Sequence, residues 1–235
     1  HNFFSKKING FCTSTLGEMK SSVAFNGENG VNATSTLQYD KHLNTFKLYV
    51  PMKKDSINIP NRTKCGIDPG IRTFLTCYSD KMTLEIGENA YIRYKKHYKK
   101  LDEINKQYSK NKIKKRKYKI AMNKQHDKIH NLTKDLHYKT TKILTTLFDT
   151  IHIGKLSTTS IVSNDKKYQL NKISKRCTYS LSHYMFRERL NFQCIKRNGT
   201  CNIINEYNTT KMCCICKSLN HNVGKSKIYK CGNCT

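Results

Sequence analysis

Four cysteines close to the end of the chain have the spacing of a metal site. Cys213 and Cys216 form one Cys-x-x-Cys pair, Cys231 and Cys234 form a second, and residues 217–230 separate the two pairs. Two such pairs can close a tetrahedral site of four thiolates with no open position, which is typical of a structural zinc ribbon. The alternative, two disulfides, would require an oxidising compartment, and no secretory signal indicates one. We therefore predict structural Zn²⁺ at these four cysteines.

Asp68 is the first candidate for chemistry on a phosphodiester. It follows Lys64–Ile67, which reads as a short buried strand, and it precedes Pro69 and Gly70, which read as a turn. Hydrolysis with two divalent metals needs carboxylates that converge from different strands, and Mg²⁺ prefers such oxygen ligands. An Asp before Pro-Gly is also typical of a simple turn. The residues alone leave both interpretations open.

The elements around Asp68 change character along the chain. Strand patterns at Lys64–Ile67, Thr73–Tyr78 and Met82–Ile86 are joined by short links, which predicts an antiparallel meander. Residues 88–153 contain neither Gly nor Pro, and their apolar residues have a helical period. We predict two helices there, broken near Ser109–Asn111. The apolar stripe of the second helix is expected to comprise Ile129, Leu132, Leu136, Ile143 and Leu147.

A basic segment lies near that predicted break. Seven of the ten residues from position 110 to position 119 are cationic: Lys110, Lys112, Lys114, Lys115, Arg116, Lys117 and Lys119. A solvated helix face is the simpler interpretation of such a run, but so many like charges destabilise an isolated helix. We therefore predict that these seven residues bind nucleic-acid phosphates.

The later elements complete a recognisable order. A fourth strand at Thr150–Ile153 ends at Gly154, and a polar linker then reaches Lys175. Ser180 is expected to cap a helix that closes at Asn198-Gly199, and a fifth strand at Cys201–Ile204 leads into Glu206. This succession predicts an α/β, RNase H-like mixed sheet in which the first, fourth and fifth strands are parallel. Their carboxyl ends meet at one edge, where open α/β sheets bind ligands.

The charge of the chain indicates a polyanionic partner. Lys and Arg number 44 against 16 Asp and Glu among 235 residues, which gives a formal net charge of +28. Nucleic acid relieves this self-repulsion and releases counterions on binding. No apolar run approaches the roughly 18 residues that a membrane-spanning helix needs, so a membrane partner is not expected.

Four segments resemble the TnpB family of transposon-encoded RNA-guided DNA endonucleases and its eukaryotic and viral relatives, the Fanzor proteins. They lie in family order at residues 64–74 (KCGIDPGIRTF), 136–139 (LHYK), 151–157 (IHIGKLS) and 207–213 (YNTTKMC). The first resembles the first RuvC motif, and its Asp-Pro-Gly followed by Arg-Thr-Phe is closer to Fanzor. The resemblance implies a RuvC domain with a catalytic Asp68, guide RNA and target DNA as partners, and catalytic Mg²⁺.

The chain departs from the family pattern in two places. Many members carry a catalytic Glu where this chain has Gly154, so the missing carboxylate must come from elsewhere. Glu206 and Glu188 are the candidates, and the position of Glu206 after the fifth strand favours it. The third RuvC motif of the family, with a further Asp, follows the zinc ribbon, and this chain ends at Thr235. We therefore expect no DNA cleavage by this chain alone. A decayed or repurposed nucleic-acid-binding copy is the alternative.

These observations predict three regions. Residues 1–60 would be the tail of a β-rich, wedge-like nucleic-acid-binding domain, 61–210 the RuvC domain with a basic helical hairpin at 88–149, and 211–235 the zinc ribbon, truncated before the third motif. We expect a monomer in a reducing intracellular compartment, which would be the nucleus in a eukaryotic host.

Overall fold

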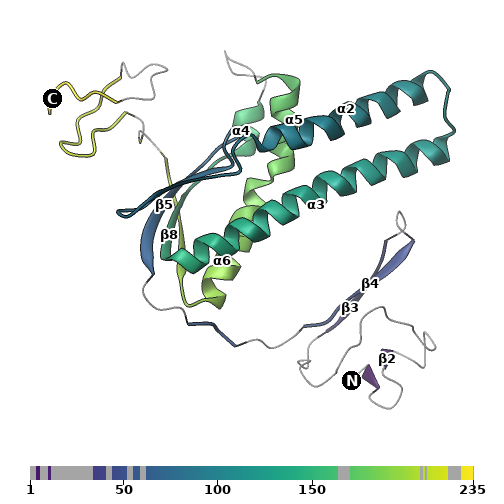
Figure 1. Ribbon diagram of the computed structural model, residues 1–235, viewed down its shortest axis with the longest axis horizontal. Helices are drawn as coiled ribbons and strands as arrows, with labels where there is room; N and C mark the ends of the chain where they lie inside the picture. Colours follow the sequence, from purple (N-terminus) through teal and green to yellow (C-terminus); the bar gives the residue numbers. More distant parts are fainter. Residues whose placement is uncertain are drawn as a thin grey trace. The chain divides into compact units, whose positions relative to one another are not determined.

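The computed structural model describes most of the chain after residue 61 and shorter stretches before it. The described residues are 4–5, 10–11, 34–40, 44–51, 55–58, 62–163, 170–206, 209, 211–221 and 229–234. The chain divides into two compact units, His1–Ser56 and Ile57–Thr235. Figure 1 shows the sheet and helices of the second unit.

The first unit contains two small antiparallel pairs of strands. Their bounds are β1 (Phe4–Ser5) with β2 (Gly10–Phe11), and β3 (Thr36–Asp40) with β4 (Thr45–Tyr49). β4 ends two residues before Pro51. The rings of Tyr39 and Phe46 pack against each other across the β3–β4 pair, with centroids 4.8 Å apart, and both remain exposed.

A five-stranded mixed sheet is the centre of the second unit. Its strands, in spatial order, are β7 (Thr83–Ile86), β6 (Leu75–Tyr78), β5 (Thr63–Pro69), β8 (Phe148–Gly154) and β9 (Thr200–Ile204). β5, β8 and β9 are parallel, whereas β6 and β7 are antiparallel to their neighbours. The predicted α/β, RNase H-like order is confirmed. One detail is corrected: Asp68 and Pro69 continue β5 and pair with β6 rather than forming a turn.

Two long helices form an antiparallel hairpin between β7 and β8 (Figure 1). They are α2 (Ala90–Ser109) and α3 (Lys115–Leu147), so the predicted break is confirmed. The expected linker up to Lys175 is wrong in part, because α4 (Thr158–Val162) and the start of α5 (Lys172–Leu181) lie there. Ser180 does not cap a helix. Instead Ser182, in the left-handed region, separates α5 from α6 (His183–Lys196).

The apolar core lies between one face of the sheet and the helices. Phe74, Leu144, Ile151, Leu181 and Phe186 are among its fully buried side chains. The other face of β5 is open, because buried and exposed residues alternate along the strand. Burial of apolar surface on one face of the sheet is therefore what fixes its register.

The buried face of α3 differs from the predicted apolar stripe. Ile143 and Leu147 are exposed, whereas Thr140, Thr141 and Thr145 are buried. The hydroxyl of Thr145 donates to the carbonyl of Thr141 at 2.7 Å, which satisfies it inside the core.

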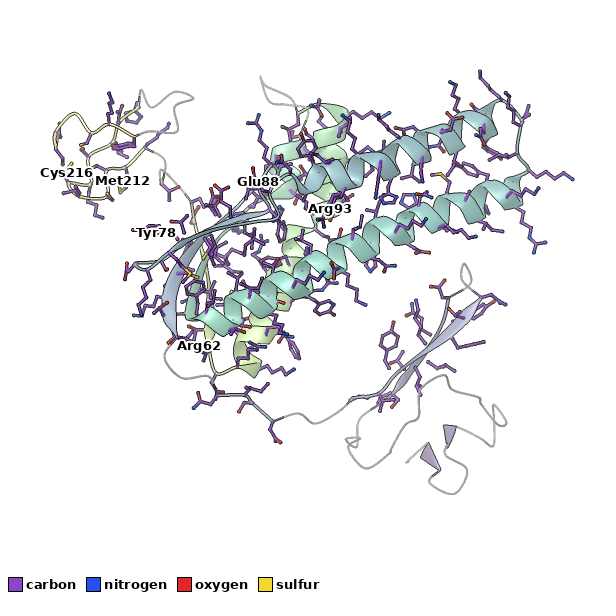
Figure 2. All side chains as sticks on the ribbon, in the orientation of Figure 1. Arg62, Tyr78, Glu88, Arg93, Met212 and Cys216 are labelled. Atoms are coloured by element: carbon purple, nitrogen blue, oxygen red, sulfur yellow. The ribbon has the colours of Figure 1, made fainter. Side chains whose placement is uncertain are left out.

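Arg62 secures the start of β5 (Figure 2). Its guanidinium donates to the carbonyl oxygens of Thr145 at 3.3 Å, Arg197 at 2.6 Å and Asn198 at 3.1 Å. These carbonyls lie near the carboxyl ends of α3 and α6, where a cation is favoured by the helix dipole. One side chain thus joins the central strand to two helices.

Candidate functional site

Asp68 lies on the open face at the carboxyl end of β5. Its neighbours Ile67 and Pro69 are buried on the opposite face, so the pleat directs Asp68 away from the core. Desolvation by the surrounding protein raises the pKa of Asp68. Gly70 follows in a tight loop, where an added Cβ would lie 2.7 Å from the carbonyl oxygen of Thr73. Only glycine fits there without displacing the backbone.

Glu206 occupies the space next to Gly154. A Cβ atom added to Gly154 would lie 1.5 Å from Oε1 of Glu206 and 2.4 Å from its Cδ. Gly154 ends β8 and is in register with Ile204 of β9, and the amide of Lys155 donates to the carbonyl of Ile204 at 2.9 Å. Because Glu206 follows β9 by two residues, its side chain reaches back over the end of β8. The carboxylate therefore stands where a side chain at position 154 would begin.

Asp68 and Glu206 influence each other electrostatically. Desolvation raises the pKa of Glu206, and the negative charge of Asp68 raises it further, while the cation of Arg187 lowers it. Two carboxylates that repel each other at a sheet edge are stabilised by a divalent cation between them. The donor set thus fits Mg²⁺, with hard oxygen ligands from two different strands.

Glu188, the other candidate for the missing carboxylate, lies elsewhere on the structure. It is exposed on α6. Although Arg187 and Arg189 flank it in the sequence, none of the ion pairs among the described residues includes Glu188. The structure brings Glu206, and not Glu188, into electrostatic contact with Asp68.

Arg187 is a site residue that sequence reasoning missed. Its guanidinium donates to the carbonyl of Leu156 at 3.3 Å, two residues beyond Gly154, and its charge acts on Glu206. The sequence signal was the Arg187-Glu188-Arg189 triplet, which reads equally well as a helix-face ion pair. Arg187 differs from Glu188 and Arg189 in that it contacts the segment after β8, and the sequence does not show this contact.

Two buried histidines support the loop after Asp68. The ring of Phe74 stacks on His137 at 5.5 Å and on His183 at 5.0 Å. Burial lowers the pKa of both histidines to about 4, so both rings are neutral at pH 7. Nε2 of His137 lies 2.8 Å from the carbonyl of Leu181 and must donate to it, which leaves Nδ1 as an acceptor.

The predicted phosphate-binding segment lies at the tip of the helical hairpin. Lys110, Lys112 and Lys114 fall in the connection, and the other four cations fall in the first turns of α3. All seven are exposed, and none takes part in the ion pairs seen among the described residues. The tip is braced by stacking of Tyr108 on Tyr118 at 4.2 Å. The cations are therefore presented together to solvent.

The four predicted zinc ligands lie together. The sulfur atoms of Cys213, Cys216, Cys231 and Cys234 are all within 4.8 Å of one another. Two of the Sγ–Sγ distances are 3.6 and 3.9 Å, close to the roughly 3.8 Å edge of a tetrahedron built on Zn–S bonds of about 2.3 Å. Figure 2 shows Cys216 in this region. The cluster can bind zinc.

The backbone around the first cysteine pair has the geometry of a metal-binding knuckle. The amide of Lys217 donates to the carbonyl of Cys213 at 3.0 Å, and Lys217 itself has a φ of 61°. The amide of Cys213 donates to the carbonyl of Ser218 at 2.9 Å, and Met212 forms a β-bridge with Leu219. Cys214 is exposed and lies outside the cluster.

None of the helices in the described part of the chain combines the length and apolar character that a bilayer-spanning helix requires.

Comparison with known proteins gives a consistent assignment. The family model OrfB_IS605, described as "Probable transposase", matches residues 49–165. TnpB-like protein L79 of Acanthamoeba polyphaga mimivirus is 37% identical over 99% of this chain and 45% of its own length. TnpB-like protein L770 of the same virus is 38% identical over 97% of this chain and 44% of its own length. The chain thus spans less than half the length of these curated relatives.

A solved structure supports the same fold. A cryo-EM structure of a Cas12f1–sgRNA–target DNA complex contains a chain that matches 80% of this one with a TM-score of 0.55 and 14% identity, over 39% of its own length. At that identity the likeness concerns the fold, which is RuvC-like in both. The chain belongs to the TnpB-like family of probable transposases.

Proposed function

We propose that this chain is part of an RNA-guided DNA endonuclease that hydrolyses phosphodiesters with two metal ions. Membership of the TnpB-like family supports the proposal, and so does the similar chain in a complex with guide RNA and target DNA. The net charge of +28 suits both polyanionic partners. In such systems base pairing reads the target sequence, while the protein binds the backbone.

The observation that carries the proposal is the position of Glu206. It restores a carboxylate beside Gly154, where family members have a catalytic Glu, and it is electrostatically coupled to Asp68. Asp68 and Glu206 would hold Mg²⁺, which when bound polarises the phosphodiester and activates water. Arg187 would hold Glu206 in place by charge. The resemblance implies a further Asp after the zinc ribbon, and residues beyond Thr235 would supply it.

The remaining parts receive supporting roles. Zn²⁺ bound to the four cysteines would fix the fold of the ribbon, since a closed thiolate site has no position for a substrate. The seven cations at the hairpin tip would bind phosphates of the guide RNA or of the DNA. We propose a monomer in a reducing compartment, or the nucleus if the host is eukaryotic.

A carboxylate exchange tests the metal site. Mn²⁺, as a spectroscopic substitute for Mg²⁺, is titrated into the chain and followed by electron paramagnetic resonance. Glu206→Gly should abolish specific binding. The double variant Gly154→Glu with Glu206→Gly should restore it, because it moves the carboxylate to the end of β8. Glu188→Gln is the control and should bind as the wild type. Normal binding by Glu206→Gly would refute the assignment.

Cleavage requires the longer protein. The gene is first read past Thr235 for an Asp that follows the zinc ribbon. The protein that contains this segment is then tested with its co-purifying RNA for Mg²⁺-dependent cutting of matched DNA, with Asp68→Ala and Glu206→Ala as inactive controls. The 235-residue chain alone should not cut. Nucleic-acid binding without cleavage by the longer protein would favour the alternative, a repurposed binding protein.

A further inference from the structure

A cavity of about 240 Å³ lies between α3, α5 and α6, away from the two carboxylates. Its walls include Thr133 and Lys134 from α3, Tyr179 from α5, and Met185 and Arg189 from α6. None of the described residues that line it is an Asp or a Glu. Pockets for drug-sized ligands occupy roughly 300–1,000 Å³, so this cavity suits a smaller group.

Arg189 is held in a fixed position at the wall of the cavity. Its Nη1 donates to Nδ1 of His137 at 2.7 Å, and this nitrogen is an acceptor because Nε2 donates to the carbonyl of Leu181. A neutral histidine orients the guanidinium without neutralising it. The remaining N–H groups of Arg189 keep a full positive charge available for a ligand.

A second cation, Lys134, lines the same cavity. The guanidinium carbon of Arg189 lies 5.3 Å from the centre of the Tyr138 ring, and Nζ of Lys134 lies 5.9 Å from the same centre. Neither cation belongs to any ion pair formed within the described ranges. Both cations line one cavity, so a phosphate bound there would be attracted to both.

Two further lining residues, Tyr179 and Met185, make part of the cavity aromatic or apolar and partly open. Tyr179 is 62% exposed and Met185 is 44% exposed, although both line the cavity. An exposed aromatic ring next to a cationic wall is what single-strand binding proteins use, since the ring stacks on a base while cations hold the backbone. A base in a duplex is already stacked and cannot enter.

We propose that this cavity binds one nucleotide of a single-stranded nucleic acid. The phosphate lies against Lys134 and Arg189, and the base lies against Tyr179 and Met185. The choice of nucleic acid as the ligand rests on the proposed function. It needs neither Asp68 nor Mg²⁺, so it can be tested separately from cleavage.

The test measures binding of labelled oligo(U), oligo(dT) and duplex DNA by fluorescence anisotropy without added Mg²⁺. Strands of about 12 nucleotides suit the usual site sizes of such proteins. Tyr179→Ala is compared with Tyr184→Ala, a matched control, because both tyrosines are 62% exposed and only Tyr179 lines the cavity. Lys134→Ala is compared with Lys142→Ala, an exposed lysine further along α3.

Tyr179→Ala should weaken single-strand binding by about tenfold, as expected for the loss of one stacked base. Tyr184→Ala should not, and neither change should affect the duplex. Lys134→Ala should reduce the slope of log K against log salt by about 0.7, whereas Lys142→Ala should leave it unchanged. The single strand that depends on Tyr179, RNA or DNA, identifies the ligand.

Photo-crosslinking of 4-thiouracil-substituted strands gives a second measurement. The adducts should map to the peptides that contain Tyr179 or Met185. Equal affinities for Tyr179→Ala and Tyr184→Ala, together with adducts elsewhere, would overturn the proposal. An equal loss on single strands and duplex would also overturn it, because the contact would then involve no inserted base. Failure of Mn²⁺ binding at Glu206 would refute the nuclease proposal and leave this result standing.

Discussion

Replacing Gly154 by Ala tests the position of Glu206 with one methyl group. The added Cβ would overlap Oε1 of Glu206, at 1.5 Å, so the side chain of Glu206 must rotate away. The atoms in conflict are at the far end of a flexible side chain rather than in the backbone. The change should therefore move a metal ligand while leaving the strand intact.

The expected magnitudes separate stability from metal binding. Gly154 has no positive φ, so Ala fits the extended backbone and should raise the free energy of unfolding by roughly 0.4–1 kcal/mol through the unfolded state. Mutation of a residue that hydrogen-bonds to a metal ligand typically lowers metal affinity about 10–100-fold. Displacing the ligand itself should lower the affinity by at least as much. Gly66→Ala on β5 is the matched control, because nothing lies within 4 Å of its added Cβ.

The assay combines Mn²⁺ titration with urea unfolding for Gly154→Ala, Gly66→Ala and Glu206→Gln. We expect weak metal binding in the first and third variants, normal binding in the second, and no loss of stability in either alanine variant. If Gly154→Ala binds Mn²⁺ as tightly as Gly66→Ala does, Glu206 is not a metal ligand and the reasoning fails. If Gly154→Ala unfolds easily, the glycine is needed for the strand itself.

Three further predictions concern other parts of the chain. Cys216→Ser should lower bound zinc and abolish the thiolate charge-transfer band of the Co²⁺-substituted protein, whereas Cys214→Ser should change neither. Burial lowers the pKa of His137 to about 4, so between pH 6.5 and about 4 the unfolded state binds more protons than the native state. Stability should be complete above pH 6.5 and should fall as the pH falls through this window, by on the order of 3 kcal/mol for each histidine, because burial lowers the pKa of His183 to the same value. His137→Gln should therefore remove about half of the fall measured by urea unfolding. The double variant Lys114→Gln with Arg116→Gln should weaken RNA and DNA binding. The slope of log K against log salt should fall by about 0.7–0.9 for each phosphate that is no longer neutralised. An unchanged slope in gel-shift titrations would show that the two side chains contact solvent and not phosphates.

The sheet was predictable because its signals are local. Alternation in β5–β7, the absence of Gly and Pro across the hairpin, and glycines at the end of β8 and after α6 indicated the order of the elements. The second half of α3 was not predictable from apolar spacing. Its buried face contains Thr140, Thr141 and Thr145. The hydroxyls of Thr141 and Thr145 donate to carbonyls of their own helix, so polar residues there do not mark a surface.

The site was predictable in its residue types and less so in its geometry. Asp68 and the four cysteines were predicted from motif and spacing, and the position of Glu206 after the last strand favoured it over Glu188. The structure shows that the charge of Asp68 acts on Glu206, while the catalytic role of both residues stays a prediction. The contact with Gly154 depends on a side chain that reaches across a strand end, which no periodicity encodes. The cavity beside Arg189 depends on the packing of three helices, and Ser182 in the left-handed region, which sets the angle between two of them, has no sequence signature of its own.

The hydrogen bonds of Arg62 constrain the order in which the protein can fold during synthesis. The carbonyl groups that Arg62 binds lie 83 to 136 residues later in the chain. The parallel neighbour of β5, β8, is also synthesised later than β5. Until β8 has left the ribosome, the central strand therefore has only the β6–β7 hairpin beside it. Long-range contacts of this kind close slowly, because the chain loses much entropy before they form. The five-stranded sheet is thus completed late, after α6 and β9 have been synthesised, and only then can Arg62 bind the carbonyls of Arg197 and Asn198.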